Sequence, residues 1–217
     1  MKNKYPCGLL VFLRTWYNIH KNQRESVKGV SMYTWEELNT FVNSCSRCGL
    51  SRSRICPVMG RGNLQSDLMF IAEAPGAEED KAGIPFIGPA GQLFDQLLGD
   101  CGISREEIYI TNILKCHPPR NRDPQDSEKE SCIPYLKYEI LLVRPKIIVC
   151  LGRVAAQRIL SSDYRITRQH GQWIQRKNYD LTAVYHPSAI LRDPGKREET
   201  RQDFLSIADK LRACRHQ

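Results

Sequence analysis

The sequence predicts an α/β fold in which helices cover both faces of a mostly parallel sheet. Short continuous apolar segments alternate with segments of helical periodicity along the 217-residue chain. A short continuous apolar run is typical of a strand that is buried on both faces, and such strands form parallel sheets. The repeated order of strand and helix therefore indicates a parallel sheet joined by crossover helices.

The first strand is expected at residues 68–72, where five apolar residues follow one another. A loop rich in Gly and Pro, from Pro75 to Gly88, separates this strand from the first core helix. Pro89 lies near the expected start of that helix and Gly102 past its end, and both are favoured boundary residues. The apolar residues at helical spacing are Leu93, Phe94, Leu97, Leu98 and Cys101.

The second strand is expected at residues 108–110, and a helix is expected at residues 126–142. Asp126 or Ser127 is suited to cap this helix, because both side chains accept hydrogen bonds from free backbone N–H groups. Pro134 must lie in the first turn of the helix or kink it, since proline has no backbone N–H to donate.

The second half of the chain repeats the alternation. Apolar runs predict a third strand at residues 146–151 and a fourth at residues 181–185, and Gly152 opens a short helix at 152–160 after the third. The polar segment 163–179 is expected to form a hairpin or excursion. Residues 196–213 predict a closing helix with one apolar face.

The first 31 residues differ in charge from the rest of the chain. The formal net charge is +8, but residues 1–31 contribute +5 of it, so the charge alone is weak support for nucleic-acid binding. Residues 8–13 resemble part of a signal peptide, but Arg14 interrupts the run and no small-residue cleavage site follows. We therefore expect residues 1–31 to be a non-core extension and residues 32–217 to form the folded domain. A secretory segment is the weaker alternative.

The composition also limits the compartment and the partners. No run reaches the roughly 18 apolar residues of a membrane span, so no membrane partner is expected. Nine cysteines without a credible signal peptide favour a reducing, cytoplasmic location. In that compartment, clustered cysteines bind metal more often than they form disulfides.

Four cysteines form a candidate metal site. Cys45 and Cys48 are separated by two residues, Cys116 follows after 67 residues, and Cys132 after 15 more. A zinc site would more typically contain a second tight pair, whereas an iron–sulfur cluster tolerates wide spacing. From spacing alone an iron–sulfur cluster, zinc and unrelated cysteines stay open. Cys56 is the substitute ligand if one of the four is misassigned.

Polar side chains follow three of the predicted strands. Glu73 ends the first strand, Asn112 the second and His186 the fourth. Ligands of open parallel sheets bind beyond the carboxyl ends of the strands. Each residue alone could be an ordinary loop or capping residue, but three at equivalent ends predict a shared site.

The motifs around these residues resemble those of the iron–sulfur-containing family-four uracil-DNA glycosylases. The first is E-A-P-G-A-E-E-D with G-I-P-F-I-G-P-A-G, within residues 73–91. The second is T-N-I-L-K-C-H-P-P at 111–119, and the third is H-P-S-A-I-L-R at 186–192. The similarity covers about residues 32–213 and includes the four cysteines.

This resemblance implies a three-layer α/β/α sandwich around a four-stranded, mostly parallel sheet. It implies a structural [4Fe–4S] cluster on Cys45, Cys48, Cys116 and Cys132. It also implies a monofunctional enzyme that flips uracil out of DNA and hydrolyses its N-glycosidic bond, leaving an abasic site. We expect uracil-containing DNA as the partner, and a monomer.

The resemblance also implies roles for single residues. Phe86 is similar to the aromatic residue that stacks on the flipped base, Asn112 to the side chain that reads the uracil edge, and His186 to the group near uracil O2. Glu73 and Glu79 match the acidic positions of the first motif. One of these glutamates is expected to orient the attacking water, and the sequence does not choose between them.

Further residues are expected to contact the base and the duplex. Backbone N–H groups around Ala74 and Gly76 are expected to assist catalysis, because Gly76 lets the chain approach closely. Ile190, Leu191 and Arg192 resemble the wedge that enters the duplex; the alternative is a surface loop. Phe86, likewise, could be a core residue under its loop.

Two departures from related sequences bear on the function. The family often has Gly before the motif glutamate, where this chain has Ala72, whose methyl group could crowd the base pocket or pack in the strand. A related branch becomes trapped on DNA through a histidine in a basic insertion. No such insertion surrounds His117, so turnover is expected.

Two alternatives to a uracil-DNA glycosylase stay open. They are a catalytically silent iron–sulfur nucleic-acid-binding module and a zinc-stabilised nucleotide-binding or hydrolase domain.

Overall fold

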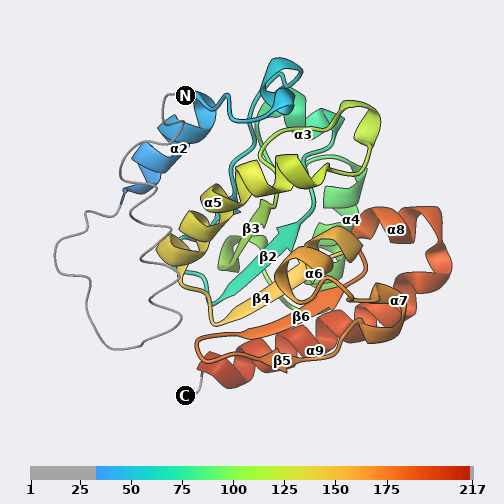
Figure 1. Ribbon diagram of the computed structural model, residues 1–217. Helices are drawn as coiled ribbons and strands as arrows, with labels where there is room; N and C mark the ends of the chain where they lie inside the picture. The colour runs from blue at the N-terminus through green and yellow to red at the C-terminus, as the bar shows by residue number, and fades with distance from the viewer. Residues whose placement is uncertain (1–32, 216–217) are drawn as a thin grey trace.

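The computed structural model describes residues 33–215, which form one six-stranded sheet between two layers of helices (Figure 1). The predicted α/β/α sandwich is confirmed. The strands are β1 (Arg61–Gly62), β2 (Leu68–Ala72), β3 (Ile108–Asn112), β4 (Ile147–Leu151), β5 (Ile174–Gln175) and β6 (Asp180–Val184). The α-helices are α2 (Trp35–Asn43), α3 (Ala77–Ala82), α4 (Pro89–Asp100), α5 (Asp126–Val143), α6 (Arg153–Ile159), α7 (Ile166–Gln169), α8 (Pro187–Arg192) and α9 (Arg197–Arg215).

The four predicted strands form the parallel centre of the sheet. The sheet order is β1-β3-β2-β4-β6-β5, and the four central strands pair in parallel. The structure adds two strands that the sequence analysis did not predict as such. They are two residues long, and each pairs antiparallel at an edge of the sheet. One of them, β5, lies in the segment expected to form a hairpin.

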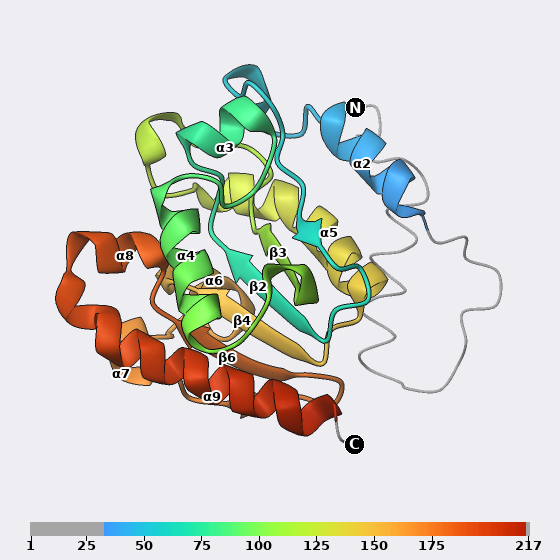
Figure 2. The same cartoon turned by 180° about the vertical axis from the view of Figure 1, so that it is seen from behind.

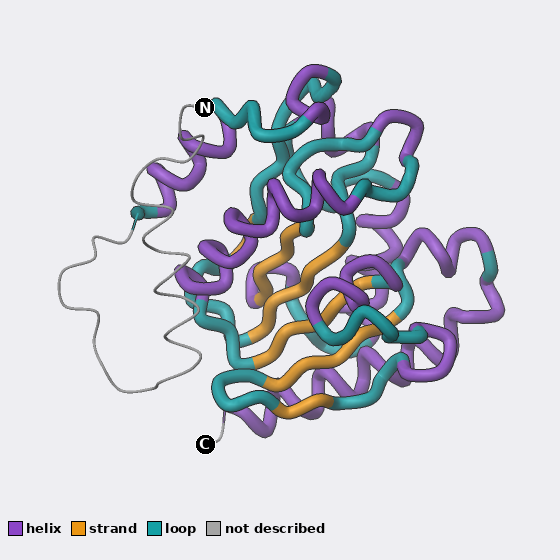
Figure 3. The backbone as a smooth tube through the Cα atoms, in the orientation of Figure 1, coloured by secondary structure: helices purple, strands orange, loops and turns teal. Residues whose placement is uncertain are grey.

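Alternating residues of the central strands face the two helical layers. Met69 and Ile71 of β2 pack in one apolar cluster with residues of α2, α5 and α6, whereas Leu68 and Phe70 pack in a second with residues of α4 and α9. Figure 2 shows α4 and α9 across the second face, and Figure 3 shows the strands enclosed between the helices. Burial on both faces explains why these strands are continuous apolar runs.

Four helices were not predicted. α2 begins with a capping box in which the Thr34 hydroxyl accepts from the Glu37 N–H and the Glu37 carboxylate accepts from the Thr34 N–H. α3 lies inside the loop expected between Pro75 and Gly88, and its first turn carries acidic side chains that the helix dipole favours. The remaining two, α7 and α8, are only four and six residues long, too short to give a clear periodic pattern.

One expectation about α5 is corrected, and another is narrowed to one of its two alternatives, a kink at Pro134. Its N-cap is Gln125, whose N–H donates to the Glu128 carboxylate at 2.8 Å, so neither Asp126 nor Ser127 caps it. Pro134 lies well inside α5 and not in its first turn. The helix continues through it because the flanking residues Ile133 and Leu136 are buried against the sheet, and this packing outweighs the lost backbone hydrogen bond.

The predicted extension at residues 1–31 lies outside the described residues, so the boundary at residue 32 stays a prediction. Among residues 33–215, no helix combines the length and the apolar character that crossing a membrane requires. Cys101 and Cys150 are buried at 6% and 0% exposure, which confirms them as core thiols.

Candidate active site and cysteine cluster

The carboxyl ends of the parallel strands surround one cavity of about 600 Å³. The residues that follow β2, β3, β4 and β6 all contribute to its wall, as expected for a parallel sheet. The structure therefore brings together the residues that the sequence analysis placed at one site. Those that line the cavity are Glu73, Ala74, Gly76, Glu79, Phe86, Asn112, His186 and Arg192.

Asn112 lines this cavity and carries a buried polar atom without a partner in the described part of the chain. The residue ends β3 and is only 2% exposed. Its Oδ1 atom is buried and has no hydrogen-bond partner among the described residues. A buried acceptor without a partner costs free energy, so its retention indicates a ligand that donates a hydrogen bond.

Phe86 supplies an aromatic surface beside the cavity and is held in an unusual backbone conformation. Its φ is 59°, a left-handed value that is uncommon for a residue with a side chain. The ring centroid lies 5.2 Å from that of Phe94 and 5.9 Å from that of His186. A Cβ atom at Gly91 would lie 2.0 Å from the Phe86 carbonyl oxygen, so α4 can approach this loop only through a glycine. Phe86 is thus both a packed residue and part of the wall.

Glu79 holds the Phe86 loop in place. Its Oε1 accepts the N–H of Ile87 at 3.0 Å and the N–H of Gly88 at 2.9 Å. The other carboxylate oxygen approaches Gly76 so closely that a Cβ there would lie 2.6 Å away. The carboxylate is therefore engaged with the backbone on both sides of the motif.

Glu73 lies at the same edge with a different environment. No hydrogen bond to its carboxylate is present among residues 33–215, although its backbone C=O accepts the N–H of Leu114 at 3.0 Å. Burial, and secondarily the negative charge of Asp123, raise the pKa of the Glu73 carboxyl. A carboxyl with a raised pKa and no protein partner is available to exchange a proton with a ligand or water.

His186 is a neutral hydrogen-bond donor. Its side chain caps α8, because Nδ1 accepts the N–H of Ser188 at 3.1 Å. Nδ1 also lies 2.8 Å from the Ser188 hydroxyl oxygen. Nδ1 is therefore the acceptor of the ring, and the proton of the neutral imidazole resides on Nε2. Burial, and secondarily the positive charge of Arg192, lower the pKa of His186 to about 4.

Gly152 allows His186 to take this position. It follows β4 directly and has a φ of 87°, a conformation that glycine adopts without strain. A Cβ at this position would lie 2.9 Å from the Cβ of His186. The strand end after β4 therefore contributes backbone to the cavity where the other three contribute side chains.

The predicted wedge residues are placed on α8, and not on an irregular loop. Ile190 is 3% exposed and packs in the core, whereas Leu191 is 51% exposed. Arg192 is exposed and lines the cavity. Only Leu191 and Arg192 thus face solvent.

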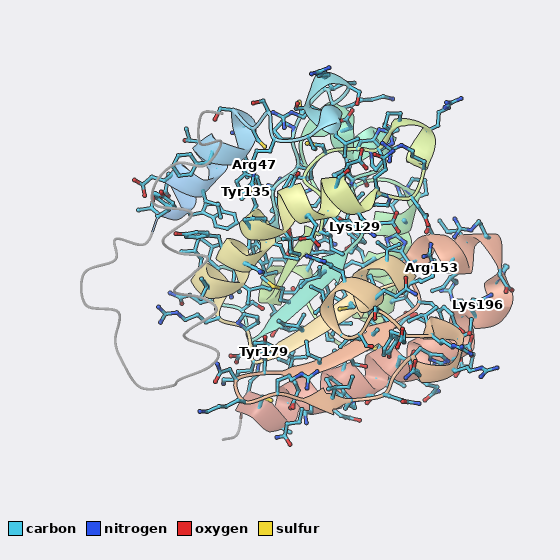
Figure 4. The ribbon with its side chains drawn as sticks, in the orientation of Figure 1. Arg47, Lys129, Tyr135, Arg153, Tyr179 and Lys196 are labelled. Carbon is cyan, nitrogen blue, oxygen red and sulfur yellow. The ribbon has the colours of Figure 1, made fainter. Side chains whose placement is uncertain are left out.

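Three basic residues at the cavity were missed by the sequence analysis: Arg122, Arg153 and Lys196. Arg153 begins α6 and pairs with Asp123 at 2.5 Å, and Lys196 lies between α8 and α9. Figure 4 labels both, on the side of the molecule where α6 and α8 lie. The position of Arg153 two residues after the third strand was the available signal. Arg192 is a further basic residue at this edge, whereas Arg153 and Lys196 are ion-paired with Asp123 and Asp193.

The two doubtful residues of the motifs lie away from the cavity wall. Ala72 is fully buried in the cluster that packs on α4 and α9, so its methyl group packs in the strand. His117 Nε2 lies 2.8 Å from the Asn121 side-chain oxygen and is not part of the wall.

The four predicted ligand cysteines line a second, small cavity. Cys45 and Cys48 follow α2, Cys116 follows β3, and Cys132 lies on α5. All four are free thiols, and two receive hydrogen bonds. Arg54 Nη1 donates to Cys116 Sγ at 3.2 Å, and the Lys115 N–H donates to Cys132 Sγ at 3.2 Å. The substitute ligand Cys56 does not line this cavity.

Cysteine thiolates are ligands both of iron–sulfur clusters and of zinc. No group of three or more ligating side chains in the described part of the chain is placed to hold one metal ion. Burial raises the pKa of Cys132 to about 12 and also raises that of Cys116, so thiolates at these sites need a positive centre to offset their charge.

Comparisons with known proteins place this geometry in a family. Residues 59–212 match the family model described as the uracil DNA glycosylase superfamily. A type-4 uracil-DNA glycosylase of Archaeoglobus fulgidus is 40% identical over 82% of this chain and 94% of that protein. That of Sulfurisphaera tokodaii is 38% identical over 82% of this chain and 85% of that protein. That of Thermotoga maritima is 37% identical over 84% of this chain and 97% of that protein. The chain therefore belongs to the uracil DNA glycosylase superfamily, and within it to the type-4 uracil-DNA glycosylases.

Proposed function

We propose that this chain removes uracil from DNA by hydrolysing the bond between uracil N1 and deoxyribose C1′, which leaves an abasic site for base excision repair. The observation that carries this proposal is the arrangement of one cavity. It combines an aromatic wall at Phe86 and a neutral donor on His186 with an Asn112 amide oxygen and a Glu73 carboxyl that accept no hydrogen bond from residues 33–215.

Base recognition follows from the hydrogen-bonding pattern of uracil. The N3–H of uracil can donate to Asn112 Oδ1, and the Asn112 amide can donate to O4. Cytosine offers an acceptor at N3 and a donor at position 4, so both contacts would be mismatched inside a buried site and rejection is strong. The base must first leave the stack, at a cost of a few kcal/mol, and the Phe86 ring offers it a flat replacement surface.

Bond cleavage places negative charge on the leaving uracil. The Nε2–H of neutral His186 is suited to donate to uracil O2, and Arg192 adds a positive charge nearby. A preorganised donor of this kind is worth about 3–4 kcal/mol in the transition state. Backbone N–H groups around Ala74 and Gly76 are available at the same wall.

Hydrolysis requires a water molecule that attacks C1′ of the cationic sugar. We assign its orientation to Glu73, whose carboxylate has no other partner in the described chain, and the proton passes from the water to this carboxylate. Glu79 is the less suitable base because its carboxylate holds the Ile87 and Gly88 N–H groups. We assign Glu79 to positioning the Phe86 loop.

Contacts with the duplex are proposed for the exposed residues at the cavity. Leu191 is suited to fill the space of the extruded base, and Arg192, Arg153 and Lys196 to meet phosphates. Ile190, which was expected in the wedge, would support Leu191 from the core. The cytoplasmic location and the monomeric state stay predictions.

We propose that Cys45, Cys48, Cys116 and Cys132 hold a [4Fe–4S] cluster. The free thiols line one cavity, and N–H donors from Arg54 and Lys115 reach two of them. When bound, the cluster would supply a structural cross-link between the α2 loop, the segment after β3, and α5. The alternative of a silent nucleic-acid-binding module is not favoured, because the whole catalytic set lines the cavity.

The function is tested with a uracil-containing oligonucleotide, followed by alkali cleavage of abasic sites. The unaltered chain should cut at the uracil position, and Asn112→Ala should lower kcat/KM by about 10²–10³-fold because it removes a contact to the base. Asn39→Ala, on exposed α2, is the matched control and should keep full activity. An unaltered chain that produces no strand scission above background would overturn the proposal.

The roles of Glu73 and Glu79 are distinguished by replacing each of them with glutamine. Glu73→Gln should lower kcat by about 10²–10⁴-fold with little change in KM, since it removes the proton acceptor. Glu79→Gln should keep most of the activity, because the glutamine carbonyl still accepts both N–H groups. Measured kcat and KM with the opposite pattern would transfer the base role to Glu79.

The neutral state of His186 predicts a stability profile. Its folded pKa lies below the ordinary 6.5, so its contribution to stability is complete above pH 6.5 and is lost as the pH falls towards about 4. His186→Asn keeps a cap for α8 and does not titrate. In urea unfolding at a series of pH values, the unaltered chain should lose stability relative to this variant between these pH limits. Parallel curves would contradict a depressed pKa.

The cluster is tested by visible absorption and iron analysis of the purified chain. The protein should be brown and contain iron, and Cys132→Ser should lose the colour and unfold at lower urea concentration, because it removes a buried ligand. Cys150→Ser is a control at a buried thiol outside the cluster and should keep the colour. A colourless, iron-free unaltered protein purified without oxygen would contradict the assignment.

A further inference from the structure

A buried lysine contacts the backbone of Asn112 at the end of β3. Lys115 is 1% exposed, and its Nζ donates to the Asn112 backbone oxygen at 2.8 Å and to Thr111 Oγ1 at 2.7 Å. Its third partner is Glu139 Oε2 on α5, at 2.5 Å. All three ammonium donors are therefore used within the protein, and none is left for a ligand.

Glu139 is equally buried and joins this lysine to the rest of the sheet. It is 0% exposed, and its Oε2 also accepts from Thr111 Oγ1 at 2.8 Å. Its Oε1 accepts from the Tyr109 hydroxyl at 3.1 Å and from the Gly60 N–H at 2.9 Å. The pair thus ties β3, α5 and the segment before β1 into one network.

Stability alone does not explain a charged pair at this place. Removing two charges from water is expensive, and apolar residues of similar volume often replace a buried ion pair with no loss of stability. The pair does fix the orientation of a backbone group. Glu139 anchors the Lys115 ammonium, and the ammonium holds the Asn112 carbonyl that it contacts. A neutral core would leave that carbonyl without a buried donor.

The contact between Lys115 and the Asn112 carbonyl matters because the Asn112 side chain is not held by a hydrogen bond at its own oxygen. Its Oδ1 has no hydrogen-bond partner among the described residues, so no bond at that oxygen orients the side chain before the ligand arrives. Its backbone is then the part that the protein can hold. The Lys115 contact at its carbonyl fixes the direction in which the side chain leaves the strand.

We infer that Lys115 and Glu139 are positioning residues for uracil recognition, which act on the base only through Asn112. This inference rests on the proposed function. Neither residue lines the active-site cavity, so neither touches the substrate. Their effect is to hold the Asn112 amide, before binding, in the orientation that the uracil edge requires.

A double-mutant cycle separates positioning from a purely structural role. The first variant, Lys115→Met/Glu139→Gln, removes both charges together and leaves no unpaired ion in the core. It should lower kcat/KM on uracil-containing DNA by about tenfold, and it should raise the inhibition constant of free uracil by a similar factor. In an Asn112→Ala background the same pair of substitutions should cause no further loss, because the contact through which the pair acts is already absent.

The matched control is Arg158→Met/Glu130→Gln, the same substitutions in an ion pair between α6 and α5 whose Glu130 side chain is 62% exposed. It should leave both constants unchanged. Urea unfolding and visible absorption verify that each variant is folded. If the first variant does not fold, Glu139→Gln carries the test, with a rise of about threefold in the uracil inhibition constant that disappears in the Asn112→Ala background.

The outcomes distinguish a failure of the proposed function from a failure of the positioning role of Lys115 and Glu139. An unaltered chain that releases no uracil overturns the proposed function, and this inference with it. An active chain whose folded variants keep their kcat/KM and uracil inhibition constant overturns only the inference. So does an equal loss in the presence and absence of the Asn112 side chain, since additivity means that the pair acts on the fold in general.

Discussion

The parallel pairing of four strands is the constraint on which the site depends. In the register of the sheet, Ala72 pairs with Asn112, and Leu151 pairs with Val184. The carboxyl ends of all four strands therefore meet at one edge, and the residues that follow them are neighbours despite separations of up to about a hundred positions in the sequence. The side chains of Glu73, Asn112 and His186 converge because the backbone hydrogen bonds align the strands that carry them.

Burial then determines the chemical state of these side chains. Desolvation disfavours charge, so it raises the pKa of Glu73 and lowers that of His186. The result is a histidine that donates a hydrogen bond without carrying a charge of its own. The basic side chains of Arg153, Arg192 and Lys196 also line the cavity, and the carboxylates of Asp123 and Asp193 pair with Arg153 and Lys196.

The short segment after β3 connects the active site to the cysteine cavity. Asn112 ends the strand, Lys115 contacts the Asn112 carbonyl through its side chain and Cys132 through its N–H, and Cys116 follows directly. Recognition and the candidate cluster thus share one piece of backbone and one helix, α5. A residue in this segment cannot move without affecting both sites, because an interior packed at high density transmits displacement.

The sequence by itself determined the four central strands, the core helices α4, α5, α6 and α9, and the residues Glu73, Asn112 and His186 at the strand ends. Apolar runs such as 68–72 and the residues that end them are local features, which can be recognised from neighbouring residues in the sequence alone. Only the tertiary structure engaged the Glu79 carboxylate with two backbone N–H groups, left that of Glu73 without a hydrogen bond among the described residues, buried Ile190 while exposing Leu191, and paired Lys115 with Glu139. Each of these depends on how side chains are placed in the folded chain, as with the Ile87 N–H that donates to Glu79, and such contacts leave no periodic signal in the sequence.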